Sequence, residues 1–173
     1  MEPRSVDDAE RPDAGVPAGA YPAPLREEGA VLLPATVAGL MAALAGGVAW
    51  GAIVRFSEYE VGIVAWAIGL LVGLAVGFAA RGTRGATLQA VAVACALLGV
   101  LVGKYLSFAW TIQDVAEEQG VEVGVLSGDM FSLFRENLDT VFGGFDLIWV
   151  ALAAITAWRM LRPEPAPAVA AGE

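Results

Sequence analysis

The chain has 173 residues, 57% of them hydrophobic, and its mean hydropathy of +0.65 is far above that of a soluble domain. A formal net charge of −9 argues against nucleic acid as a partner, because binding to phosphates needs clustered Lys and Arg side chains. With no histidine and a single cysteine, Cys95, the sequence offers no common zinc site, CxxC pair or His-activated nucleophile, so it predicts neither an enzyme nor a metal or cofactor site.

Four nearly uncharged blocks follow an N-terminal segment rich in Pro, Gly, Ala and acidic residues. Each block approaches the ~20 apolar residues that a helix needs to cross the hydrocarbon layer. The segments before and after the blocks cannot bury enough surface to order, and are predicted to be disordered tails. The sequence thus predicts an all-α membrane protein, a four-transmembrane-helix bundle over residues 30–161. Its parts are a tail at 1–29, spans at about 30–54, 61–80, 85–110 and 141–161, an outer loop at 111–140 and a tail at 162–173.

The fourth block is the weakest of the predicted spans. Its uninterrupted apolar part, Leu147 to Trp158, is short for a crossing. It reaches full length only if residues 141–146, which include Asp146 and a double glycine, belong to the span. Three spans followed by a re-entrant or interfacial segment are therefore the alternative.

Small residues recur at four-residue spacing in the first three spans, which places them on one face of each helix. One interpretation is a glycine zipper that assembles several copies around a pore. We favour packing of the helices within one chain, because ridges of small residues are general at membrane interfaces. The series are Gly39, Ala43, Gly47, Gly51, then Ala65, Gly69, Gly73, Gly77, then Cys95, Gly99, Gly103, Ser107.

The predicted outer loop contains an amphipathic helix. Apolar residues recur there at spacings of three and four, from Met130 to Phe142, and polar residues occupy the other face. Ser127 or Asp129 is the expected N-cap. Because this helix is acidic rather than basic, a lid over the helices or a partner-docking element is favoured over a lipid-surface anchor.

The distribution of Lys and Arg predicts the orientation, because cytoplasmic flanks of spans accumulate these residues. One side of the membrane receives Arg4, Arg11, Arg26, Arg81, Arg84, Arg159 and Arg162. The other side has Arg55, Arg135 and Lys104 but most of the Asp and Glu residues outside the N-terminal tail. We therefore expect both termini in the cytoplasm.

Two charged residues lie at membrane depth, away from the ends of the spans or within a predicted crossing, where a stranded charge costs several kcal/mol by most scales. Lys104 is about 9 Å inside the outer end of span three, and Asp146 about 6 Å past Phe142, at 1.5 Å per residue. Opposite charges at similar depth predict a buried ion pair between Lys104 and Asp146. The pair would be structural, or would form part of a substrate or proton path.

Further polar and aromatic residues carry weaker predictions. Arg55, Glu58 and Glu60 are candidate charges at the outer mouth of the bundle, where they would join the Lys104–Asp146 pair. Gln89 is expected to hydrogen-bond a neighbouring helix. The tryptophans near span ends are interpreted as interface anchors and the deeper ones as packing residues. The anchors are Trp50, Trp110 and Trp158, and the packing residues are Trp66 and Trp149.

Several short motifs resemble a group of uncharacterised four-span bacterial membrane proteins. They are Tyr59-Glu60-Val61-Gly62, Ala65-Trp66-Ala67-Ile68-Gly69, Arg81-Gly82, Gly103-Lys104-Tyr105, Asp146-Leu147-Ile148-Trp149 and Thr156-Ala157-Trp158-Arg159. The resemblance covers spans two to four and implies a bacterial inner-membrane location with no assigned activity. Small multidrug exporters also have four spans, but they rely on an acidic residue in the first span, and residues 30–54 contain none.

These features favour a non-enzymatic integral membrane protein, a structural, assembly or accessory subunit of the bacterial cell envelope. Its expected partners are the lipid bilayer and either further copies of the chain or a larger membrane complex. The alternative is a small transporter or channel that uses Lys104 and Asp146 in a polar path. A solute path needs a polar lining, and the spans are poor in polar residues.

Overall fold

The computed structural model describes residues 25–57 and 62–163, and all regular structure in these ranges is helical. The predicted all-α class is therefore confirmed. Glu58, Glu60 and most of both predicted tails lie outside the described residues. The six helices are α1 (Leu25–Ser57), α2 (Ile63–Ala79), α3 (Ala86–Glu118), α4 (Gly128–Glu136), α5 (Leu138–Val141) and α6 (Gly144–Met160).

Two of these helices are long and apolar enough to cross a membrane. They are Gly29–Ser57, within α1, and Ala86–Glu118, the whole of α3. The helices α2 and α6 have 17 residues each. Each is about 26 Å long at 1.5 Å per residue, close to the lower limit for a crossing. Length and composition alone thus indicate two candidate spans.

Two helix ends differ from the predicted boundaries. The helix α1 begins at Leu25, within the segment 1–29 that the sequence predicts to be a tail. Pro24 precedes this start in the sequence, and the residues that follow it, Leu-Arg-Glu-Glu, are good helix formers. The helix α3 continues past Trp110 to Glu118, because residues 111–118 contain no Gly or Pro. It ends just before Gly120, whose φ of +75° terminates the helix.

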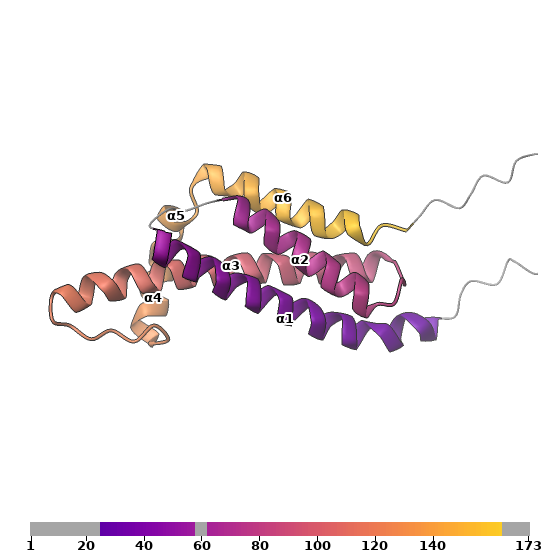
Figure 1. Cartoon of the computed structure of the whole chain (residues 1–173), viewed down its shortest axis with the longest axis horizontal. Helices are drawn as coiled ribbons and strands as arrows, with labels where there is room; N and C mark the ends of the chain where they lie inside the picture. The colour runs from indigo at the N-terminus through magenta and orange to yellow at the C-terminus, as the bar shows by residue number, and fades with distance from the viewer. Residues whose placement is uncertain (1–24, 58–61, 164–173) are drawn as a thin grey trace, which may run out of the picture.

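The helices α1, α2, α3 and α6 lie side by side, with α2 in contact with each of the other three (Figure 1). The helices α1 and α3 run in one direction and α2 and α6 return in the other. Alanine and valine dominate the core that they share, whereas many larger apolar side chains point outward. Small core residues allow close approach of the helix axes.

The predicted packing glycines face other helices of the same chain. A Cβ atom added at Gly47 would lie 2.8 Å from the Gly99 carbonyl oxygen, and one at Gly103 would lie 2.7 Å from Trp50 Cε3. At Gly69 it would meet the backbone of Ala153 in α6. Close contacts within the chain also occur at Gly51, Gly73 and Gly99, whereas a Cβ atom at Gly77 would make only an ordinary contact with Leu161 Cδ2 at 3.6 Å. Apart from Gly77, these glycine positions are therefore occupied by packing within one chain.

The segment beyond α3 forms two short helices rather than one amphipathic helix. The hydroxyl of Ser127 accepts a hydrogen bond from the Met130 amide at 3.2 Å, which confirms Ser127 as the N-cap of α4. The predicted continuity to Phe142 is wrong, because the helix breaks at Asn137. The Asn137 amide group donates to the Leu133 carbonyl at 2.8 Å, a local bond that competes with helix continuation.

Candidate functional site

The structure brings Lys104 and Asp146 together. Lys104 lies on α3, one residue after the contact of Gly103 with α1, and Asp146 lies in the first turn of α6. Lys104 Nζ is 3.0 Å from Asp146 Oδ2, and the two side chains are 1% and 20% exposed. The contact joins two helices that are separated in the sequence by the whole outer segment.

Asp146 also helps to cap the N-terminus of its own helix, α6. Its Oδ2 atom accepts a hydrogen bond from the Gly143 amide at 3.0 Å. A carboxylate in this position interacts favourably with the positive end of the helix dipole. One carboxylate oxygen therefore contacts both the lysine ammonium and the helix start.

Two aromatic rings flank the ammonium group. Lys104 Nζ lies 5.8 Å from the ring centroids of both Trp50 in α1 and Phe142, which is within the range of cation–π attraction. Trp50 is 1% exposed, so its interpretation as an interface anchor is wrong. Gly103 permits this position, because a Cβ atom there would collide with the indole ring. The Trp50 Nε1–H is buried and has no hydrogen-bond partner among the described residues.

A cavity of about 280 Å³ adjoins Lys104 under α5. Ser107 and Thr111 from α3, and Asn137 and Thr140 from the α4–α5 segment, contribute polar groups to its wall. The Ser107 and Thr111 hydroxyls donate at 2.9 Å to the carbonyls of Gly103 and Ser107, so their oxygen atoms face the cavity mainly as acceptors. The cavity wall mixes polar and apolar groups, and it adjoins a cation that is paired with Asp146.

Arg55 lies in a second charge cluster at the same end of the helices. Its Nη2 atom is 2.7 Å from Asp114 Oδ1, and its guanidinium lies 5.9 Å from the Trp110 ring centroid. Asp114 belongs to the extension of α3 that the sequence did not predict as helical. The other candidate charges of this mouth, Glu58 and Glu60, lie outside the described residues.

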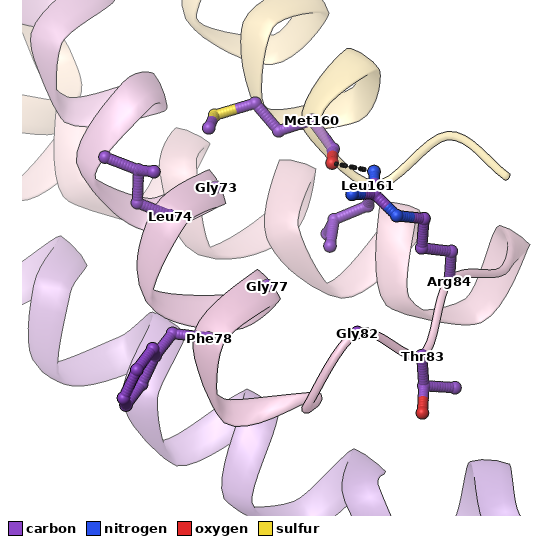
Figure 2. A pocket seen from close by; sticks show the side chains of 9 residues that line it. All are labelled: Gly73, Leu74, Gly77, Phe78, Gly82, Thr83, Arg84, Met160 and Leu161. Atoms are coloured by element: carbon purple, nitrogen blue, oxygen red, sulfur yellow. Dashed lines mark hydrogen bonds between the residues drawn. The ribbon is translucent and has the colours of Figure 1, made fainter. Parts of the chain in front are cut away.

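The opposite end of the helices is held by hydrogen bonds to the last turn of α6. Gln89 Nε2 donates to the Trp158 carbonyl at 3.1 Å, which confirms the expected interhelical bond. Arg84 Nη1 donates to the carbonyl of Met160 at 2.9 Å (Figure 2). It also donates to the carbonyl of Arg162 at 3.3 Å. Arg84 thus satisfies backbone groups that a helix C-terminus leaves unpaired.

Three contributors to these charge clusters were not predicted from the sequence: Trp50, Phe142 and Asp114. Trp50 follows Gly47 by three residues and therefore lies on the same helix face. This spacing indicates that Trp50 is buried between helices. No comparable signal marks Asp114, because its role depends on where α3 ends. Within the described ranges, no group of three His, Cys, Asp or Glu side chains could hold a metal ion.

The Lys104–Asp146 pair, flanked by the rings of Trp50 and Phe142, fixes α3 against α6. Comparisons with protein-family models, curated proteins and solved structures find no match.

Proposed function

We propose that the chain is a non-enzymatic membrane protein of four spans, with both termini in the cytoplasm of a bacterial cell. If α1 and α3 cross the bilayer in the same direction, α2 must return between them (Figure 1). The helix α6 lies beside α2 and runs the same way. The turn at residues 81–85 then lies on the side that the arginine distribution assigns to the cytoplasm.

Its proposed role is that of a structural, assembly or accessory subunit. The observation that carries this role is that most of the small-residue faces of the spans pack within the chain, whereas the end of α3, α4 and the loop between them project beyond the packed helices (Figure 1). We call this projection, residues 111–141, the outer platform. It exposes apolar side chains such as Leu126, at 88%, and Phe131 among acidic residues. Exposed apolar groups of this kind favour contact with a partner.

A small transporter is the second candidate, and the cavity beside Lys104 is the observation that favours it. Transport through this region would require separation of Lys104 from Asp146 to admit a solute. The ion pair between Lys104 and Asp146 and the tight packing at the glycines argue against a solute path through this region, so the subunit role is preferred.

Co-purification in mild detergent tests the two roles. We expect a different membrane protein to accompany the wild-type chain in fixed stoichiometry, and the double variant Leu126→Glu/Phe131→Glu to lose it. Ser132→Glu is the matched control, because Ser132 is already exposed and polar on α4. Purification of a homo-oligomer alone, with ion release from liposomes that Lys104→Met abolishes, would establish the transporter instead.

A further inference from the structure

Two grooves meet at the end of α2 that carries the arginine turn. One has a volume of about 310 Å³ and runs between α2 and the end of α6 (Figure 2). The other, of about 840 Å³, runs between α2 and the beginning of α1. Both grooves are lined by Gly77, Phe78 and Gly82. Phe78, which is 91% exposed, therefore stands between them as a ridge.

The floor of the first groove is apolar and has room for a side chain at Gly77. Gly73, Gly77, Leu74 and Met160 line it. A Cβ atom at Gly77 would lie 3.6 Å from Leu161 Cδ2, an ordinary contact, so this glycine is not required by helix packing. The missing side chain leaves a channel along α2 that an extended hydrocarbon chain can occupy.

An arginine stands at the mouth of each groove. Arg84 lines the first and Arg81 the second. Arg81 and Gly82 have positive φ values of 51° and 83°, and this tight turn keeps both arginines close to the end of α2. Both Arg84 hydrogen bonds use Nη1, and within the described part of the chain its Nε and Nη2 hydrogens remain for another acceptor.

We propose that this end of α2 binds an anionic phospholipid. The headgroup phosphate contacts Arg81 and Arg84, and one acyl chain lies in each groove beside the Phe78 ridge. Arginine suits this role because its fork of donors matches phosphate oxygens. The proposal rests on the membrane placement given above, which puts the turn at the level of the cytoplasmic headgroups.

Charge favours this occupant. Among the described residues that line the two grooves, the charged side chains are Arg84 in the first and Arg81 in the second. Apart from Glu27 and Glu28 in the first turn of α1, the described acidic residues lie in the outer platform or at Asp146, at the far end of the packed helices. An anionic lipid supplies both the negative charge and the apolar chains that the grooves accommodate.

Native mass spectrometry of the purified full-length protein tests the proposal, with phosphatidylglycerol and phosphatidylcholine of the same acyl chains as probes. We expect phosphatidylglycerol to bind about tenfold more tightly. Arg81→Gln and Arg84→Gln should each weaken this binding about fivefold. Gly77→Leu should displace a chain and reduce binding of both lipids. Arg84→Lys should restore part of the affinity, because it keeps the charge and loses the fork.

Arg159→Gln is the matched control, since it removes the same charge from the same end of the molecule outside both grooves. It should change the affinity by less than about twofold, because only charges close to the headgroup contribute strongly. Equal binding of the two lipids, or equal losses in Arg81→Gln and Arg159→Gln, would overturn the proposal. So would displacement by inorganic phosphate, or a dimer that Gly77→Leu dissociates. A wrong membrane placement would instead appear as reversed labelling of the turn in intact cells.

Discussion

Replacing Asp146 with asparagine is expected to lower the free energy of unfolding by about 3 kcal/mol. The change removes the carboxylate 3.0 Å from Lys104 Nζ, and that ammonium is 1% exposed. Asparagine keeps the shape of the side chain and an oxygen that can accept from the Gly143 amide. The loss of stability therefore measures the contribution of the negative charge. Denaturation in detergent micelles, followed by tryptophan fluorescence, measures the effect.

Lys104→Met should cost less, about 1–2 kcal/mol, because Asp146 is partly exposed and keeps its hydrogen bond with the Gly143 amide. The double variant should be less destabilised than the sum of the single variants, with a coupling free energy of about 1–3 kcal/mol. Additive losses would show that the two charges do not stabilise each other and would remove the proposed structural role of the pair.

Gly69→Ala is expected to destabilise the protein by about 3 kcal/mol, because overpacking against backbone cannot be relieved by a rotamer change. The added Cβ atom would lie 2.6 Å from Ala153 Cα and against the carbonyl oxygen of the same residue. Either α6 moves away from α2 or the helix bends. Both responses weaken the contact that positions Asp146 opposite Lys104.

Gly77→Ala is the control on the same helix. Its Cβ atom has an ordinary contact distance of 3.6 Å to Leu161 Cδ2. Alanine favours a helix interior over glycine by about 0.5–1 kcal/mol, so stability should stay the same or rise slightly. Equal losses at both positions would mean that α6 does not pack on α2 as the structure places it.

The sequence was most informative about the position of residues along the helices and about which face of each helix packs against its neighbours. Uncharged blocks locate the helices, and counting residues along them puts Lys104 and Asp146 at similar levels. Small residues four apart mark helix faces that contact other helices at Gly47, Gly69 and Gly103, but not closely at Gly77. Both properties depend on local composition and helical geometry, which can be read directly from the sequence.

Three features of the site depend on tertiary contacts and could not be predicted in this way. Trp50 turns inward because Gly103 on another helix makes room for its ring. The last turns of α3 are polar, so the apolar block that predicts the span ends at Trp110. The helix itself continues beyond this residue and brings Asp114 close to Arg55. Arg84 contacts α6 only because the end of that helix lies beside the turn after α2.

The central claim is that α6 forms a fourth membrane crossing, which is the span that the sequence predicts most weakly. Cysteine labelling in intact cells tests this claim most directly. Single probes at Thr83→Cys, Leu126→Cys and Pro163→Cys sample the turn after α2, the outer platform and the end of α6; Cys95 is buried and does not compete. With a membrane-impermeant maleimide, the account predicts labelling of residue 126 alone, and of residues 83 and 163 only after permeabilisation. Labelling of residue 163 from outside would show that α6 does not cross, and labelling of residue 83 would reverse the orientation.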